Sequence, residues 1–176
     1  ALLGRARPGD MGFDIMHYNV HKTFASPHGG GGPGAGPIGV VDELTGFLPD
    51  PHVRETDDGS FEFYEPAESI GKVHGFYGNW LVLLKTYAYI SRLGDGGLKD
   101  TSAMAVLNAN YLASQIDLDI PYGPFHHEFV ASAGDVDAAE FAKGMLDEAV
   151  HPPTTKWPEI VDEALMTEPT EALSKD

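Results

Sequence analysis

One lysine of the sequence, Lys22, stands among imidazole and aromatic neighbours directly before a loop that is nearly all glycine. His21 and Phe24 flank this lysine, and the glycine loop covers residues 29–36. Such surroundings can desolvate a lysine amine and keep part of it neutral, as a Schiff-base lysine requires. Glycines let backbone amides approach an anion or a flat ring without interference from a Cβ atom. The combination therefore indicates a covalently held aldehyde cofactor with a phosphate tail, and pyridoxal phosphate fits best.

Two strand-like segments have to position this lysine. Residues 13–16 precede it and residues 38–41 follow the glycine loop. The pattern of strand, lysine turn, loop and strand is typical of an α/β protein. We therefore expect a turn to carry Lys22, and we expect the strands to belong to a parallel sheet whose covering helices lie upstream.

Other interpretations of this stretch are weaker. A lysine is most often simply a surface residue. His17 and His21 are four residues apart, but that spacing brings two metal ligands to one face only in a helix, and the segment between them indicates a strand or turn. His127 has no second ligand at zinc spacing, so we expect no metal site. The glycine loop could be a flexible linker, but its prolines indicate a shaped loop, and no Gly-Lys-Ser/Thr follows it as in a nucleotide phosphate loop.

The composition limits the partners and the compartment. Eleven Lys and Arg residues against 27 Asp and Glu residues give a net charge of -16, which repels nucleic acid and anionic membrane. Acidity spread along the chain predicts adaptation to high salt, and an ordinary acidic enzyme is the alternative. The sequence has no cysteine, hence no disulfide framework and no thiolate chemistry. No apolar run approaches the ~20 residues of a membrane span, and we expect a cytoplasmic protein.

The remaining elements follow from turn and helix signals. Asp58 and Gly59 predict a hairpin between residues 53–56 and 61–64. We expect a buried helix over residues 77–93, stopped by Gly94. A second helix is predicted over residues 98–116, with its apolar face formed by Ala103, Val106, Leu107, Asn110, Tyr111 and Ser114.

A small α/β unit should complete the chain. We predict a strand at residues 129–131 and then a helix capped by Asp137, with Glu140 three residues further on. The buried face of that helix should consist of Phe141, Met145, Leu146 and Ala149. Short strands are expected within residues 151–157 and at residues 164–166.

The segment His17-x-Asn19-x-His21-Lys22-Thr23-Phe24, followed by Pro27-His28 and the glycine loop, resembles the cofactor-lysine segment of the glycine decarboxylase P-protein of the glycine cleavage system. Further pieces agree in the family's order, so the resemblance covers nearly the whole chain. They are Gly78-Asn79-Trp80, Tyr87-Ala88-Tyr89-Ile90, the run from Ala105 to Leu112, His127-Glu128-Phe129-Val130, His151-Pro152-Pro153-Thr154 and the run from Glu163 to Glu171.

The resemblance implies an α/β protein with the aspartate-aminotransferase-like fold, the type I fold of pyridoxal-phosphate enzymes. Residues 1–75 would be the end of the large cofactor-binding domain, residues 76–95 a connecting helix and residues 96–176 the small C-terminal domain. Lys22 would bind pyridoxal phosphate covalently and act as the catalytic residue. Asn19, His21, His28, Gly31 and Gly32 would line the cofactor, and His127, Glu168 and Thr170 would belong to the substrate pocket.

The implied activity is that of an oxidoreductase, glycine dehydrogenase (aminomethyl-transferring). Such an enzyme decarboxylates glycine and passes the aminomethyl group to the lipoyl arm of the H-protein, whose disulfide is reduced. Another pyridoxal-phosphate decarboxylase or aminotransferase is the alternative. Since the residues that stack on the ring and pair with its nitrogen are not recognisable here, we expect an inactive fragment that needs an upstream segment or another P-protein subunit in an oligomer.

Overall fold

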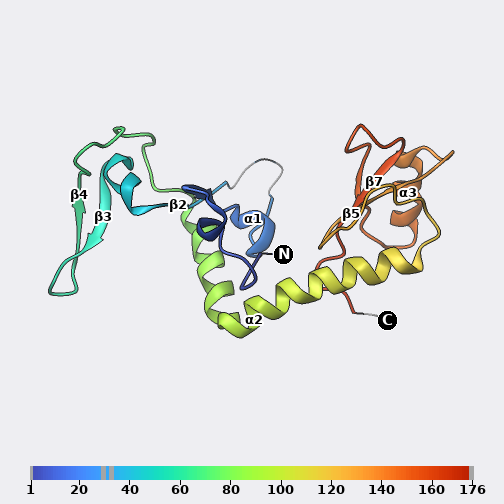
Figure 1. Ribbon diagram of the computed structural model, residues 1–176, viewed down its shortest axis with the longest axis horizontal. Coiled ribbons are helices and arrows are strands. Elements are labelled where there is room, and N and C mark those ends of the chain that lie inside the picture. The colour runs from blue at the N-terminus through green and yellow to red at the C-terminus, as the bar shows by residue number, and fades with distance from the viewer. Residues whose placement is uncertain (1, 29–30, 32–33, 175–176) are drawn as a thin grey trace. The chain divides into compact units, whose positions relative to one another are not determined.

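The computed structural model describes residues 2–28, 31 and 34–174, which form two compact units of mixed helix and strand (Figure 1). One unit comprises Ala6–Gly94, and the other comprises the described residues from Asp95 onward together with residues 2–5. The assignment of residues 1–75, 76–95 and 96–176 to a large domain, a connecting helix and a small domain stays a prediction. Within the described residues, no helix combines the length and the apolar character that crossing a membrane requires.

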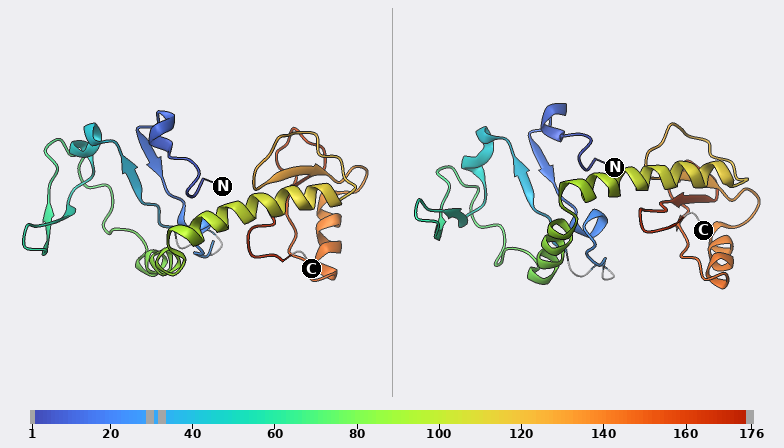
Figure 2. Two further views of the ribbon diagram at one scale, coloured as in Figure 1. Left: turned by 60° about the horizontal axis from the view of Figure 1, so that its bottom comes forward. Right: turned by 90° about the horizontal axis from the view of Figure 1, so that it is seen from below.

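The first unit is built around two short strands, β1 (Ile15–His17) and β2 (Ile38–Val40), which lie side by side (Figure 2). They pair antiparallel, with Met16 opposite Gly39. The expectation of a parallel sheet is therefore wrong for this pair, because the described part of the connection contains no long crossover helix of the kind that joins parallel neighbours. A one-turn helix, α1 (Val20–Thr23), lies in that connection where we expected only a turn. Two 3-10 helices, Pro8–Met11 and Asp42–Phe47, flank the strand pair in sequence.

The predicted hairpin is confirmed as β3 (His52–Glu55) and β4 (Phe61–Tyr64), antiparallel strands with Val53 opposite Phe63. Its turn is organised by Asp58, whose Oδ1 accepts hydrogen bonds from the hydroxyls of Thr56, at 2.6 Å, and Ser60, at 2.7 Å. These two hydroxyls, together with the Ser60 backbone N–H, lower the pKa of Asp58 to about 2. Asp58 therefore stabilises the hairpin turn, as the sequence predicts.

The long segment α2 (Trp80–Gln115) consists of two helices joined at Gly94, as the sequence predicts. Gly94 has φ 60° and ψ -173°, a conformation that is essentially restricted to glycine and that interrupts the helix. It is not the left-handed helical conformation of an ordinary glycine stop. The predicted helix limits, residues 77–93 and 98–116, agree with the observed ends to within a few residues. The prediction that the first helix is buried is wrong, because Trp80, Leu81 and Tyr87 are 72%, 67% and 69% exposed. Only one face, with Val82 and Thr86, is buried.

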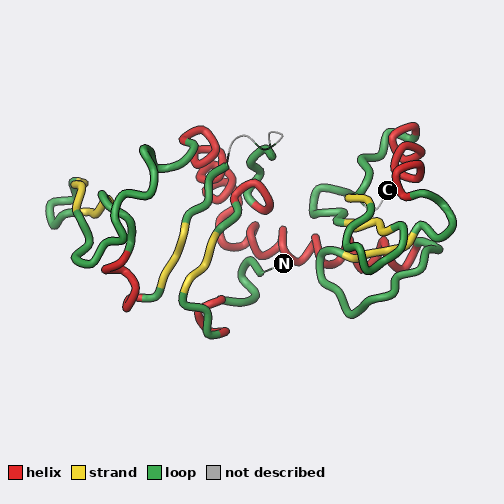
Figure 3. Tube along the Cα trace, turned by 90° about the horizontal axis from the view of Figure 1, so that it is seen from above, coloured by secondary structure: helices red, strands yellow, loops and turns green. Residues whose placement is uncertain are grey.

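The second unit pairs the C-terminal half of α2 with a three-stranded antiparallel sheet (Figure 3). The sheet has the order β5-β7-β6, formed by β5 (Phe129–Ser132), β7 (Ala164–Thr167) and β6 (Thr154–Thr155). One core cluster joins Ala109 of α2 to Phe129 and Ala131 of β5. Another joins Leu165 of β7 to Ala133 and Ala138. All three predicted strand regions, at residues 129–131, within 151–157 and at 164–166, are confirmed.

The buried face of the second helix is displaced from the predicted one. Ala105 and Ala109 are 9% and 0% exposed, whereas Leu107 and Tyr111 are 58% and 43% exposed. Small alanines face the sheet because they allow β5 to approach the helix closely, which a rule that follows the large apolar residues does not anticipate. The predicted apolar face was therefore wrong.

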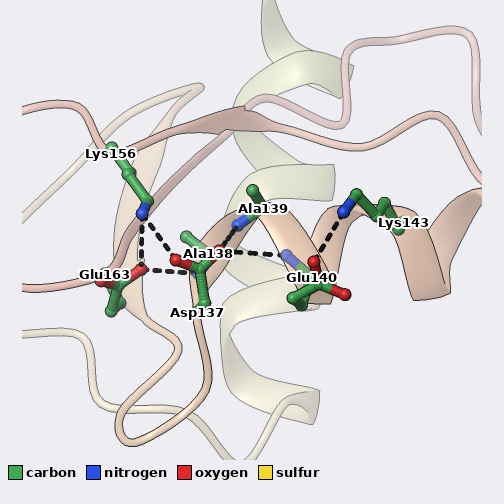
Figure 4. Close-up of polar contacts among 7 residues, drawn as sticks. All are labelled: Asp137, Ala138, Ala139, Glu140, Lys143, Lys156 and Glu163. Carbon is green, nitrogen blue, oxygen red and sulfur yellow. Dashed lines mark hydrogen bonds and ion pairs between the residues drawn. The ribbon is translucent and has the colours of Figure 1, made fainter.

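The last helix, α3 (Ala138–Asp147), begins at the predicted cap. Asp137 Oδ1 accepts hydrogen bonds from the backbone N–H groups of Ala139, at 2.8 Å, and Glu140, at 3.2 Å. Figure 4 shows how Lys156 and Glu163 complete this helix start. The buried face was predicted only in part: Phe141 and Met145 are half-buried, whereas Leu146 and Ala149 are exposed.

Candidate functional site

Lys22 lies on α1, in the connection between the antiparallel strands β1 and β2. Its backbone N–H donates to the Asn19 carbonyl at 3.2 Å, which closes the single helical turn. The side chain is exposed. The expected desolvation of its amine is therefore not supplied by the residues that the structure describes, because His21 and Phe24 lie beside the lysine without covering it.

Two predicted cofactor residues, His21 and His28, lie together. Their ring centroids are 4.9 Å apart and the rings meet edge to face, at an interplanar angle of 75°. The contact joins α1 to the residue that directly precedes the glycine loop. His17, by contrast, lies on β1, so His17 and His21 do not share a helix.

Asn19 precedes α1 but does not cap it with its side chain. Its Oδ1 atom is buried and has no hydrogen-bond partner among the described residues. A buried carbonyl oxygen without a donor is costly, which makes this atom a candidate acceptor for a donor on a bound group. Tyr89 of α2 carries the other such atom, its hydroxyl oxygen.

The glycine loop lies partly outside the described residues, and Gly32 is among those left out. Gly31 is described and has φ +93°, a conformation that side chains rarely adopt, with nothing within 4 Å of the place where a Cβ atom would be. The loop therefore leaves open space at this position. At Gly36, in contrast, a Cβ atom would meet the imidazole ring of His17, which would have to move.

The Lys22 helix is attached to the first half of α2 by Phe24 and by further residues that the sequence analysis did not single out. The rings of Phe24 and Tyr89 meet edge to face with centroids 6.4 Å apart. Ser26 and Thr86 form a buried hydroxyl pair at 3.1 Å. The available signal was the recurrence of Val82, Thr86 and Tyr89 on one face of a helix that the pattern marked only as apolar on most faces.

The predicted substrate residues belong to the other unit. His127 Nε2 lies 3.9 Å from Glu168 Oε1, and both side chains are partly exposed. The Asn108 side chain donates to the Thr170 carbonyl at 2.8 Å, and the Asn110 side chain donates to the His126 carbonyl at 3.1 Å. Two asparagines of α2 thus hold the segments that carry His127, Glu168 and Thr170.

The described residues contain no group of three or more His, Cys, Asp or Glu side chains that could hold a metal ion. The site around Lys22 instead offers an exposed lysine, two adjacent imidazoles, a buried acceptor without a partner among the described residues and open space at Gly31. A primary amine forms a covalent bond with an aldehyde, and the acceptor and rings can hold a flat polar group beside it. These residues fit pyridoxal phosphate.

Known proteins with similar sequences match this chain along nearly its whole length. Residues 101–176 match the family described as "Glycine dehydrogenase, C-terminal domain". A "Probable glycine dehydrogenase (decarboxylating) subunit 2" of Halobacterium salinarum is 77% identical over 99% of this chain and 37% of the relative. The corresponding protein of Thermotoga maritima is 52% identical over 100% of this chain and 39% of the relative. The chain thus spans well under half the length of the curated relatives that it matches.

Solved structures share the fold. A crystal structure of glycine decarboxylase (P-protein) of the glycine cleavage system, in inhibitor-bound form, matches with a TM-score of 0.78 over 97% of this chain and 42% of that chain, at 22% identity. An apo cysteine desulfurase from Thermococcus onnurineus matches with a TM-score of 0.62 over 92% of this chain and 43% of that chain, at 14% identity. The α/β fold expected from the sequence, the type I fold of pyridoxal-phosphate enzymes, is confirmed.

Proposed function

Because this chain is homologous along its whole length to glycine dehydrogenase (decarboxylating) subunit 2, we propose that it carries the cofactor lysine and the C-terminal domain of a glycine decarboxylase. The enzyme would depend on pyridoxal phosphate and belong to the glycine cleavage system. The observation that carries the proposal is the exposed Lys22 on its one-turn helix, beside His21 and His28 and ahead of the glycine loop.

In this proposal Lys22 Nζ would hold pyridoxal phosphate through a covalent bond to its aldehyde carbon, formed with loss of water, and would carry a proton to or from the substrate carbon. Asn19 Oδ1, the buried acceptor, receives a hydrogen bond from the bound group. The His21 and His28 rings pack beside it, and Gly31 leaves room for its approach. Gly32, which lies outside the described residues, stays a predicted cofactor residue. When bound, pyridoxal phosphate supplies an electron sink that allows an amino-acid carboxylate to leave as carbon dioxide.

The second unit would contribute to the substrate side. His127, Glu168 and Thr170 are the proposed pocket residues, with glycine as substrate. The proposed macromolecular partner is the H-protein, whose lipoyl arm would accept the aminomethyl group as its disulfide is reduced. Another P-protein subunit or segment, in an oligomer, would supply the groups that hold the cofactor ring.

The test is exchange of labelled bicarbonate into the carboxyl group of glycine by the intact natural protein, with lipoyl H-protein present. The Lys22→Ala variant should lose exchange by about 10²–10⁴-fold, because both the covalent attachment and the proton transfer are removed. Lys72→Ala and Lys85→Ala, which also change exposed lysines, are the matched controls and should retain it.

Two results would count against the proposal. Exchange retained by Lys22→Ala would show that the cofactor lysine lies elsewhere. Exchange with another amino acid but not with glycine would favour a different pyridoxal-phosphate decarboxylase or aminotransferase.

A further inference from the structure

Two buried hydroxyls hold the chain just after Lys22 against the first half of α2. Ser26 is 7% exposed and Thr86 is 8% exposed. Their oxygens lie 3.1 Å apart, and the Val82 carbonyl lies 3.0 Å from Thr86 Oγ1 and 3.4 Å from Ser26 Oγ. Three polar atoms from two segments 56 or more residues apart in sequence thus meet in an apolar setting.

The donors of this group can be assigned from the number of hydrogens available. Each hydroxyl has a single hydrogen. Thr86 donates to the carbonyl of Val82, four residues earlier in the same helix, at the shorter distance of 3.0 Å. Ser26 Oγ can then donate to Thr86 Oγ1 at 3.1 Å or to the Val82 carbonyl at 3.4 Å, and both acceptors belong to α2. Ser26 consequently depends on α2 for its partner.

The rest of the Lys22 segment follows the same face of α2. Val82, Thr86 and Tyr89 are spaced four and three residues apart, which places them in one row along the helix. Ser26 contacts this row at Thr86, and Phe24 contacts it at Tyr89 with ring centroids 6.4 Å apart. Between them Ala25 has φ 57°, the left-handed conformation that turns the backbone from one contact to the next.

The consequence concerns the lysine. Val20, the first residue of α1, is 1% exposed, while Lys22 two residues later is exposed. One side of the short helix is therefore buried and the other presents the lysine. A four-residue helix has too few internal hydrogen bonds to hold its own orientation. Its orientation must come from the contacts on either side of it.

We propose that Ser26 and Thr86 are positioning residues, whose hydroxyl pair fixes the Lys22 helix on α2 and so sets where the lysine amine stands. The proposal rests on the proposed role of Lys22 as the cofactor lysine. This role requires no contact between either hydroxyl and the cofactor. They act through the backbone between Lys22 and Ser26.

The experiment uses the intact natural protein and the variants Thr86→Val, Thr86→Ser and Ser26→Ala. Thr86→Val keeps the shape of the side chain but removes the hydroxyl, and Thr86→Ser keeps the hydroxyl. Ser114→Ala, which removes an exposed hydroxyl bonded only within its own helix turn, is the control. Two quantities are measured: hydrogen exchange of the backbone amides of residues 20–26 without cofactor, and the affinity for pyridoxal phosphate followed by absorbance.

Thr86→Val and Ser26→Ala should each accelerate amide exchange in residues 20–26 and weaken the affinity by about three- to tenfold, the loss expected for one hydrogen bond. Thr86→Ser should restore both quantities, and Ser114→Ala should leave them unchanged. If Thr86→Val does not fold, Ser26→Ala carries the test. The inference would be overturned if Thr86→Val and Ser26→Ala showed the same amide exchange in residues 20–26, and the same affinity for pyridoxal phosphate, as the unsubstituted protein.

A different measurement tests the proposed function, so its failure can be distinguished from failure of the positioning role of Ser26 and Thr86. If pyridoxal phosphate is not attached to Lys22 in the unsubstituted protein, as borohydride reduction and peptide mapping would reveal, the cofactor role is wrong. Amide exchange without cofactor would still report whether the hydroxyl pair fixes the helix.

Discussion

Lys156 Nζ lies 2.7 Å from Asp137 Oδ2, so the loop between β6 and β7 is bound to the residue that caps α3. Glu163, at the other end of that loop, lies 3.7 Å from the same ammonium group and accepts a hydrogen bond from the backbone N–H of Ala138 at 2.6 Å (Figure 4). One lysine and two carboxylates thus connect the start of the helix to the sheet.

The first prediction concerns the pH dependence of this connection. The Lys156 ammonium, followed by the backbone N–H groups of Ala139 and Glu140, lowers the pKa of Asp137. A carboxyl group whose pKa is lower in the folded state stabilises the fold above its unfolded-state pKa, and that contribution is lost as the pH falls through the folded-state pKa. Asp137→Ala should therefore lower the melting temperature at pH 7, and the difference from the unsubstituted protein should shrink as the pH falls below 3.8.

The stabilisation by the Asp137–Lys156 ion pair is also lost at high pH. Asp137 raises the pKa of Lys156, so the contribution of Lys156 is present below its unfolded-state pKa of 10.5 and is lost as the pH rises through the raised value. Asp135→Ala, an exposed acid two residues earlier, is the control and should leave the melting temperature nearly unchanged. An Asp137→Ala difference that stayed constant from pH 7 to pH 2 would contradict this explanation.

The second prediction concerns Asn108, whose side chain donates to the carbonyls of Thr170 and Leu173 at 2.8 and 3.1 Å. Asn108→Ala leaves both carbonyls without this donor, so the free energy of unfolding in urea should fall by about 1–3 kcal/mol. Amides near Thr170 should exchange faster, and the KM for glycine should rise if Thr170 belongs to the pocket. Gln115→Ala, on the same helix, is the control. Unchanged exchange near Thr170 would show that the asparagine does not hold this segment.

The third prediction tests the small-unit core through Leu165, which is 2% exposed on β7. Leu165→Ala should reduce the free energy of unfolding by about 2–5 kcal/mol, because it removes buried methyl groups and leaves a cavity. Leu146→Ala, at a position that is 57% exposed on α3, should cost less than about 1 kcal/mol. Equal losses at the two positions, measured by urea unfolding, would mean that Leu165 does not belong to the core.

Local signals in the sequence predicted local structure well. The Asp58-Gly59 turn, the Asp137 cap and the break at Gly94 are all present, because each depends on the backbone preferences of a few adjacent residues. The C-terminal strands also occur where predicted. The resemblance to a known family supplied the fold class, which short-range patterns alone leave open.

Long-range relationships were not accessible in this way. The antiparallel pairing of Met16 with Gly39 depends on how the chain between them folds, and strand direction leaves no local mark. The helix face of Ala105 and Ala109 was missed because apolar residues occur on both sides of that helix. Ser26 and Thr86 are ordinary hydroxyl residues until the fold brings them together.

The fourth prediction concerns salt. A net charge of -16 produces self-repulsion, and the Debye length shrinks from about 10 Å at about 0.1 M to about 3 Å at about 1 M salt. The melting temperature should therefore rise with potassium chloride, as the 77% identity to a Halobacterium salinarum protein also suggests. If the melting temperature stays constant or falls between these salt concentrations, adaptation to high salt does not explain the acidity of the chain.

The central claim is that Lys22 is the lysine that binds pyridoxal phosphate. The most direct measurement is to load the intact protein with the cofactor, reduce it with borohydride and map the peptides. The pyridoxyl group should be found on Lys22, and Lys22→Ala should lose the visible absorbance of the bound cofactor while its melting temperature changes little, since the side chain is exposed. A pyridoxyl group on Lys72 or Lys85 instead of Lys22 would contradict the claim.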